Sequence, residues 1–240
     1  DPLNEWVEVE GARSPGLVPF EDMPQLERAD FVFNANDSYW LSNPDEPLTG
    51  YSPLHGEADV PQAPRTQQNA LTLQGEPAAG LDDLDLETFT LDEVQEALLG
   101  NVGRTAVVLR DEVVARCEGS PLIEACDALA AWDGRYDVDS YGAALWREFM
   151  SQFDYESIID AGELFAEPFD PERPLETPSG LVPAPAGGPD PIIAALGAAA
   201  SSLTDRGFAL DAPLGALQHS GPKPGRISVP GGMFRDGTMN

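Results

Sequence analysis

The sequence is short of basic charge and of long apolar runs, and both shortages exclude classes of partner. Its 240 residues include 42 acidic but only 13 basic side chains, for a formal net charge of -29. Such a chain repels nucleic-acid phosphates and anionic membranes, so we expect neither as a partner. No run approaches the ~18 apolar residues that a membrane-spanning helix needs, which predicts a soluble chain.

Cysteine and histidine are equally scarce, with two residues of each, so the usual ligands of a structural metal are few. Cys117 and Cys126 lack the spacing of a zinc site, and the acidic groups at 82–85 and 137–139 lack that of a calcium-binding loop. We therefore expect no metal site and no cofactor. The two thiols fit one disulfide or two buried free thiols equally well.

Glycine and proline are abundant instead, at 23 residues each, which indicates a loop-rich structure. Residues 1–30 are polar and turn-rich. Residues 30–34, Asp-Phe-Val-Phe-Asn, have the aromatic and β-branched composition of a short strand. The proline-punctuated stretch from Leu41 to Arg65 is predicted to be a long loop, kept in order by the aromatic and leucine residues within it.

A helical block follows this loop. Thr90 and Glu93 match a capping box, in which each side chain accepts the backbone N–H of the other residue, so a helix is expected over 91–99. Apolar residues at spacings of three and four predict further helices within 106–117, 122–132 and 141–153. Another helix is expected from Pro191 to near Gly207, and a short strand at 226–230.

These patterns indicate an α+β fold with a mainly helical lobe. We assign residues 1–88 to a strand and long loop segment, 89–165 to the helical lobe, and 166–240 to a proline-rich linker, a helix and a return strand. All three segments are expected to form one partial domain.

One segment carries a specific resemblance. Residues 33–44 read F-N-A-N-D-S-Y-W-L-S-N-P, and residues 47–53 read P-L-T-G-Y-S-P. This order of residues resembles the large chain of the penicillin acylase family, especially its members that act on N-acyl homoserine lactones and lipopeptides. Arg65-Thr66, A-C-D-A-L at 125–129 and V-P-G-G at 229–232 match the family in the same order. The chain is thereby identified as an internal piece of such a large chain.

The resemblance implies a fold and a reaction. The family belongs to the N-terminal nucleophile hydrolases, whose αββα sandwich would be present here only in part, with some unpaired strand edges. A serine exposed by self-cleavage attacks an amide carbonyl, and its own α-amino group, with a pKa of ~7.7 to 8.0, acts as the base. The expected activity of the parent protein is hydrolysis of a linear N-acyl amide, with a role in antibiotic metabolism or quorum quenching.

The resemblance also assigns two site residues in this chain. Asn36 is expected to donate to the oxyanion, and Arg65 to hold Asn36 and the terminal amine in place. From the residues alone, an asparagine at a strand end more often stabilises a turn. Ser38, although it follows Asp37, is expected to stabilise a turn rather than act as a nucleophile, because neither histidine has a sequence reason to approach it.

Other candidates have structural interpretations. His55 is expected to be a loop residue, and Trp40, Tyr51 and Trp146 could line an acyl pocket but are favoured as core residues. The first residue is Asp1 rather than serine, so the chain alone is expected to lack a nucleophile and activity.

The partners expected for the parent are a small N-acyl substrate and the other segments of the same precursor, its small chain included. The resemblance implies a periplasmic or secreted location. The alternative is a non-catalytic module that binds a ligand or serves as an assembly surface.

Overall fold

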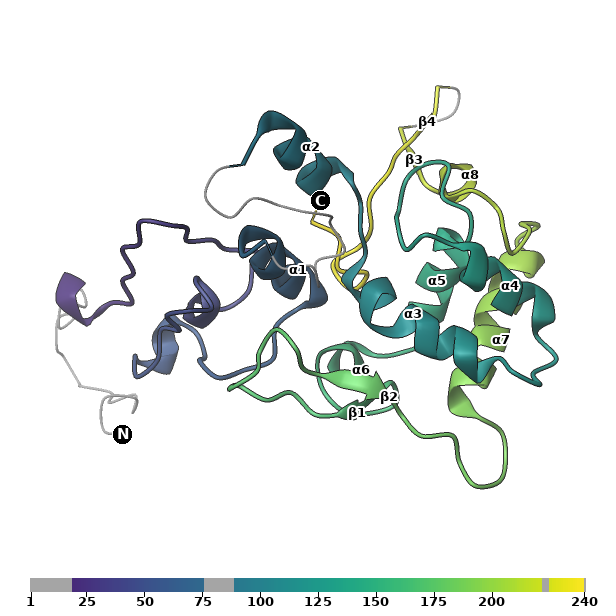
Figure 1. Cartoon of the computed structure of the whole chain (residues 1–240), viewed down its shortest axis with the longest axis horizontal. Helices are drawn as coiled ribbons and strands as arrows, with labels where there is room; N and C mark the ends of the chain where they lie inside the picture. Colours follow the sequence, from purple (N-terminus) through teal and green to yellow (C-terminus); the bar gives the residue numbers. More distant parts are fainter. Residues whose placement is uncertain (1–18, 76–88, 222–224, 240) are drawn as a thin grey trace, which may run out of the picture.

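Figure 1 shows a computed structural model that describes residues 19–75, 89–221 and 225–239. The helices are α1 (Pro64–Leu73), α2 (Leu91–Leu99), α3 (Arg104–Arg116), α4 (Ile123–Ala131), α5 (Ala143–Met150), α6 (Tyr155–Ile159), α7 (Pro191–Asp205) and α8 (Leu214–Leu217). Two antiparallel hairpins pair β1 (Phe165–Glu167) with β2 (Ser179–Leu181), and β3 (His219–Ser220) with β4 (Ile227–Ser228). The α+β class is therefore confirmed.

A lobe of helices contains the main hydrophobic core. The helices α3, α4, α5 and α7 pack together on one side of the molecule, and residues 19–75 extend to the other side (Figure 1). Trp146 of α5 is fully buried at the centre, with its ring centroid 5.8 Å from that of Trp132 and 5.2 Å from that of Phe149. The expectation that Trp146 is a core residue is confirmed.

All five predicted helices are present as α2, α3, α4, α5 and α7, four of them with small shifts at their ends. The capping box of Thr90 and Glu93 is formed, and α2 occupies the predicted residues. The next helix, α3, begins two residues before its prediction, because Gly103 provides an N-cap position. In the part of the chain that the structure describes, no helix is long and apolar enough to cross a bilayer.

Two predictions about residues 30–65 need correction. No strand forms at 30–34: the Phe33 N–H donates to the Ser42 carbonyl at 3.0 Å, and the Phe31 carbonyl accepts from the Asn43 side chain, so no ladder is built. The long loop ends before Arg65, because α1 begins at Pro64. Proline is compatible with the first turn of a helix, and this proline starts an element rather than interrupting one.

The short elements α6, α8 and β3 and the hairpin of β1 with β2 were not predicted. The predicted strand at 226–230 is present as the two residues of β4. Among the described residues these hairpins are the only sheets, so the larger sheets of a sandwich are not built by this part of the chain.

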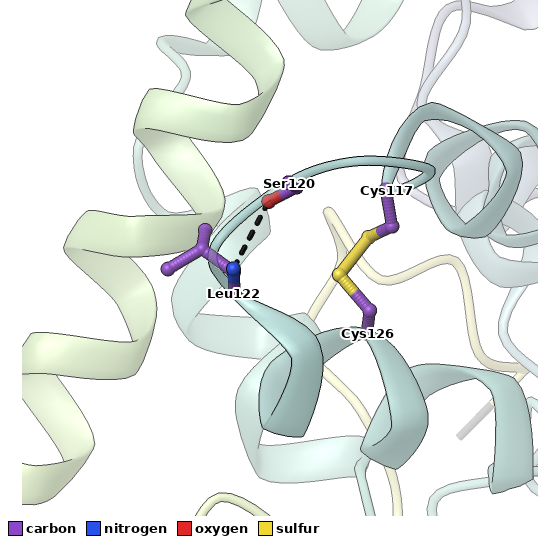
Figure 2. The surroundings of a disulfide bond; sticks show 4 residues. All are labelled: Cys117, Ser120, Leu122 and Cys126. Carbon is purple, nitrogen blue, oxygen red and sulfur yellow. Dashed lines mark hydrogen bonds between the residues drawn. A yellow bond between two sulfur atoms is a disulfide. The ribbon is translucent and has the colours of Figure 1, made fainter.

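A disulfide joins the end of α3 to α4. Cys117 and Cys126 are bonded, with their Cα atoms 6.0 Å apart (Figure 2). The turn between the two helices is further stabilised by the Ser120 hydroxyl, which accepts the Leu122 N–H at 3.1 Å. Of the two alternatives that the sequence left open, the structure has the disulfide.

Candidate active site

The candidate site is built on a tight turn over residues 34–37. The side-chain oxygen of Asn34 accepts the N–H of Asn36 at 2.9 Å, and its amide nitrogen donates to the Asp37 carbonyl at 3.3 Å. Asn36 itself has a φ of 70°, in the left-handed region that asparagine tolerates better than most residues. The turn therefore presents the Asn36 side chain at the surface.

Arg65 in the first turn of α1 holds this side chain. Its Nη2 donates to the Ala35 carbonyl at 2.6 Å and to Asn36 Oδ1 at 2.9 Å. Because a guanidinium can only donate, it requires the oxygen of the Asn36 amide, and the orientation of that amide is thereby set. The NH₂ group of Asn36 is left as a donor, and no acceptor for it is present among the described residues.

Asp37 fastens the turn to the start of α1. Its Oδ2 accepts the Ala63 N–H at 2.9 Å and also the hydroxyl of Thr66. A carboxylate at a helix N-terminus satisfies N–H groups that have no partner within the helix and interacts favourably with the helix dipole. Asp37 and Arg65 thus join the two segments of the site by bonds in both directions. The part of Asp37 in this connection was not indicated by the sequence.

Ser38 has a structural contact. Its hydroxyl donates to the Glu57 carbonyl rather than to an imidazole, although His55 is only two residues away from Glu57. His55 lies in a 3-10 helix over Pro53–His55, within the loop as expected. The arrangement required of a serine nucleophile activated by histidine is not formed by these residues.

Buried polar and aromatic side chains that follow the turn in the sequence pack beside the site segment. Asn43 is fully buried and ties the preceding segment together, since it donates to the Phe31 carbonyl and accepts the Asp45 N–H, each at 2.9 Å. Trp40 is also buried, with its ring edge-on to Phe169 at 6.4 Å, which confirms it as a core residue. Tyr51 is only half-buried and lies edge-on to Tyr39.

Helix α1 is itself anchored by polar side chains. Gln67 is buried, and its amide donates to the carbonyls of Pro174 at 3.0 Å and Thr177 at 2.8 Å. These contacts explain why apolar periodicity did not reveal α1: its buried face includes Thr66, Gln67 and Thr72. The loop at 174–177, in which Thr177 is buried and Glu176 is exposed, thus holds the helix that carries Arg65.

Tyr155, at the start of α6, is a neighbour of the site that the sequence did not indicate. Burial raises the pKa of its phenol, the negative charge of Asp37 raises it further, and the positive charge of Arg65 opposes the shift. Its ring also lies edge-on to Phe234, with the centroids 5.6 Å apart. A tyrosine of a distant helix is thus within electrostatic reach of both residues that shape the turn.

The arrangement provides a fixed amide donor beside a guanidinium. The described residues contain no group of three or more His, Cys, Asp or Glu side chains that could hold a metal ion. Asn36 and Arg65, predicted as partners, are brought together. A positioned amide N–H is the kind of group that stabilises an oxyanion, but it supplies neither a nucleophile nor a base.

Comparisons with known proteins show similarity to one family over nearly the whole chain. A model of the penicillin amidase family matches residues 1–235. The acyl-homoserine lactone acylase PvdQ of Pseudomonas putida is 37% identical over 179 residues, which cover 74% of this chain and 21% of that protein. The aculeacin-A acylase of Actinoplanes utahensis is 33% identical over 179 residues, which cover 70% of this chain and 22% of that protein.

A third relative matches almost the whole chain. The acyl-homoserine lactone acylase PvdQ of Pseudomonas savastanoi pv. phaseolicola is 31% identical over 234 residues, 95% of this chain and 29% of that protein. The chain thus spans between a fifth and a third of the length of these relatives. With the family match extending over nearly every residue, the chain belongs to the penicillin amidase family.

Proposed function

We propose that this chain is part of an acylase that hydrolyses a linear N-acyl amide, and that Asn36 is one of its oxyanion donors. The observation that supports this most directly is the hydrogen bond of 2.9 Å from Arg65 Nη2 to Asn36 Oδ1. It leaves the Asn36 NH₂ group as a donor at a fixed position. Relatives named for their action on acyl-homoserine lactones and aculeacin-A support an acylated amide as the substrate class.

The proposed reaction needs a serine at the start of the large chain, which would come from outside these 240 residues. Its hydroxyl oxygen forms a bond to the amide carbonyl, and the α-amino group takes the hydroxyl proton through a water. The carbonyl oxygen becomes an oxyanion, to which Asn36 Nδ2 donates. Collapse of this intermediate breaks the C–N bond, and the proton held by the α-amino group passes to the leaving amine. The acyl-serine that remains is then hydrolysed by water.

Arg65 has a positioning role in this proposal. Its guanidinium orients the Asn36 amide before substrate arrives, and a preorganised donor needs no rearrangement as charge develops. The Nε of Arg65 is buried and has no acceptor among the described residues, so one more acceptor from the parent protein would complete its bonds. Such an acceptor fits a site that several segments of one precursor build together.

We extend the proposal to fold and location. In the parent, the chain would contribute to an αββα sandwich whose remaining strands come from other segments. The Cys117–Cys126 disulfide supports a periplasmic or secreted location, because disulfides persist mainly in oxidising compartments.

The test is the Asn36→Ala variant of the full-length parent protein. Loss of an oxyanion donor is expected to lower kcat by about 100- to 1,000-fold with a small change in KM. Gel electrophoresis of the purified protein checks that the precursor has still cut itself, so that only matured enzyme is compared. Unchanged kcat in matured Asn36→Ala would refute the role and favour a binding or assembly module.

Arg65→Lys separates positioning from charge. Lysine keeps the positive charge but cannot reproduce the planar fork that reaches both the Ala35 carbonyl and Asn36. We expect kcat to fall by about 10- to 100-fold, the loss of one charge-assisted hydrogen bond. An Arg65→Lys enzyme with full kcat would show that only the charge of Arg65 matters.

A further inference from the structure

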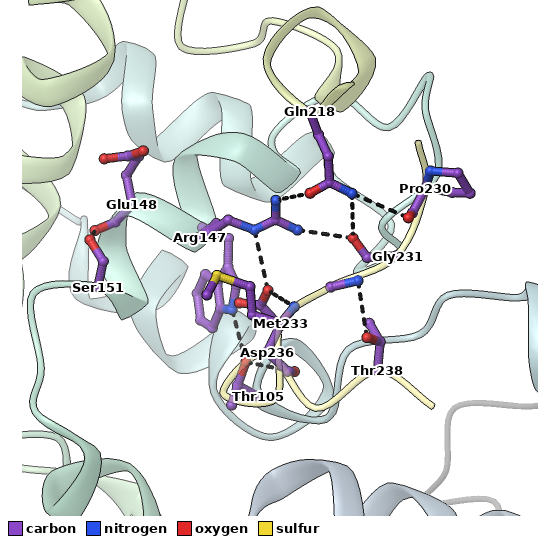
Figure 3. Close-up of polar contacts among 12 residues, drawn as sticks. Thr105, Arg147, Glu148, Ser151, Gln218, Pro230, Gly231, Met233, Asp236 and Thr238 are labelled. Carbon is purple, nitrogen blue, oxygen red and sulfur yellow. Dashed lines mark hydrogen bonds and ion pairs between the residues drawn. The ribbon is translucent and has the colours of Figure 1, made fainter. Parts of the chain in front are cut away.

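The tail turn, defined here as residues 231–238, is a compact polar structure near the end of the chain. The carboxylate of Asp236 accepts the Met233 N–H at 2.6 Å (Figure 3). The Asp236 and Gly237 N–H groups both donate to the Met233 carbonyl. The hydroxyl of Thr238 accepts the Gly232 N–H at 3.0 Å. Asp236 and Thr238 are both 0% exposed, so the turn is part of the interior.

The helical lobe holds one side of the tail turn. Arg147 of α5 bonds to Asp236 through its Nε at 3.2 Å and to the Gly231 carbonyl through Nη2 at 3.0 Å (Figure 3). Thr105 donates twice to the Asp236 carbonyl, through its backbone N–H at 3.3 Å and through its side-chain hydroxyl at 3.2 Å. The turn therefore caps the first turn of α3, whose N-cap residue, Gly103, has no side chain to do so.

The other side of the tail turn faces the start of α1. A Cβ built on Gly237 would lie 2.9 Å from Pro64 Cβ and 2.5 Å from Arg104 Cβ. Both distances are shorter than any ordinary carbon–carbon contact, so only glycine fits between the two helices. Pro64 directly precedes Arg65. In Figure 1 the tail correspondingly runs between α1 and α3.

A second contact connects the tail turn with the same site. Phe234 lies edge-on to Tyr155, the tyrosine whose phenol is influenced by the charges of Asp37 and Arg65. The tail turn thus touches the surroundings of Arg65 at two points, through Pro64 and through Tyr155. It also bonds to α3, to α5, to the Tyr136 carbonyl and to the Gln218 side chain, so it links the lobe to the site.

We propose that the tail turn is a positioning element of the Asn36 site. Gly237 allows the starts of α1 and α3 to approach closely, and the bonds of Asp236 with Arg147 fix the turn at this place. The position of Pro64 then sets where the Arg65 guanidinium meets the Asn36 amide. The inference rests on the proposed function and adds Gly237 as a positioning residue that does not itself contact substrate.

The test compares two glycines in the full-length matured enzyme. Gly237 and Gly207 have nearly the same left-handed φ, +80° and +82°, so alanine introduces similar backbone strain at both. Gly207 has no atom within 4 Å of a built Cβ, whereas Gly237 meets Pro64 and Arg104. We expect Gly237→Ala to lower kcat by about 10- to 100-fold at nearly constant KM, because small misplacements near reacting groups are costly. Gly207→Ala should retain kcat within about twofold, as a surface change remote from the site.

A double-mutant cycle identifies the route of the effect. If Gly237 acts through Arg65, then Gly237→Ala should add less than about a twofold further loss to Arg65→Ala, since coupled residues are not additive. Full additivity of the two substitutions would overturn the inference. Should Gly237→Ala fail to mature, Thr238→Val replaces it, because this variant removes the hydroxyl bond to Gly232 without adding volume; we expect about a fivefold loss of kcat, as for one hydrogen bond.

The outcomes separate this inference from the proposed function. If Asn36→Ala keeps full kcat, the proposed function fails. If Asn36→Ala and Arg65→Ala both lower kcat while Gly237→Ala behaves like Gly207→Ala, the function stands and the tail-turn inference is wrong. Where Thr238→Val replaces Gly237→Ala, an unchanged kcat in the matured Thr238→Val enzyme would likewise show that the tail-turn inference is wrong.

Discussion

The helical lobe around Trp146 and the segment that contains Asn36 are held together by different forces. In the lobe, apolar side chains of α3, α4, α5 and α7 form one buried cluster. In residues 31–66, side chains bond to backbone groups of other segments: Asn43 to Phe31, Arg65 to Ala35, Asp37 to Ala63. The lobe depends on the total amount of buried surface, and the site segment depends on individual directional bonds.

This difference separates stability from geometry. Burial is non-directional and roughly proportional to area, so a lobe can lose a contact and still keep its shape. A hydrogen bond weakens steeply with angle and distance, so a site held by few bonds changes its geometry when one is removed. We expect lobe variants to affect the free energy of unfolding, and site variants to affect kcat more than stability.

The largest effect is expected in the lobe. Trp146→Ala empties the centre of the core and should lower the free energy of unfolding by about 3 to 5 kcal/mol. Urea denaturation followed by far-ultraviolet circular dichroism measures it. Leu98→Ala on α2 is the control, because this leucine is about half exposed (48%), and such surface changes usually stay within about 0.5 kcal/mol. A similar loss in both variants would contradict the distinction.

The disulfide gives the next largest effect, also in the lobe. Replacing Cys117 and Cys126 together by serine frees a short loop and should cost about 2 to 3 kcal/mol of stability. The Asn36–Arg65 contact belongs to the other region, so kcat of the parent should stay unchanged at temperatures where the variant is folded. If kcat fell in proportion to the loss of stability, the geometry of the site would depend on the stability of the lobe, which contradicts the distinction between the two regions.

In the site segment, Asp37→Ala removes two hydrogen bonds, each with a net value of about 1 kcal/mol. We expect a small drop in the free energy of unfolding and a clear drop in kcat, since α1 is no longer fastened beside the turn. Thr66→Val is the matched control, because it removes only one of the two bonds. Equal kcat in the wild type and Asp37→Ala would show that the turn keeps its geometry unaided.

The smallest effect concerns pH and α6. Asp154 caps this helix by accepting the Ser157 N–H at 2.9 Å, and this bond lowers the pKa of the Asp154 carboxyl. Because the folded-state pKa is lowered, the ionised carboxyl stabilises the folded state at pH values above the unfolded-state pKa, which is near 3.8. This stabilisation is lost as the pH falls through the folded-state pKa. Asp154→Asn should flatten the acid limb of a stability profile measured by urea denaturation. If the wild type and Asp154→Asn lost stability equally as the pH falls, ionisation of Asp154 would make no contribution to the pH dependence.

Local patterns allowed part of this structure to be predicted from the sequence. The capping box at Thr90 and Glu93 predicted the start of α2 and Gly100 predicted its end, because all of these signals are local. Helix α1 was missed because its buried face is polar and its Pro64 resembles a loop residue. Residues 30–34 had the composition of a strand but pair with no strand among the described residues, and composition alone does not reveal whether a partner strand exists.

Only part of the site was predicted from the sequence. Asn36 and Arg65 were indicated by resemblance to a family, and the structure brings them together. The contact of Gly237 with Pro64 joins residues far apart in the chain, and the pairing of Arg147 with Asp236 does the same. A glycine that fits a narrow space and one that simply turns the chain look alike in a sequence, so only the packing distinguishes Gly237 from Gly207.

The indole of Trp146 has a further use. Its Nε1–H donates to the Thr105 hydroxyl at 3.1 Å, and this hydroxyl donates in turn to the Asp236 carbonyl of the tail turn. A buried proton held in this way exchanges with solvent only when the structure around it opens. The indole proton resonance of Trp146 therefore reports on this junction, and its exchange rate in D₂O would measure how often the structure around the contact of α3 with the tail turn opens, without any label.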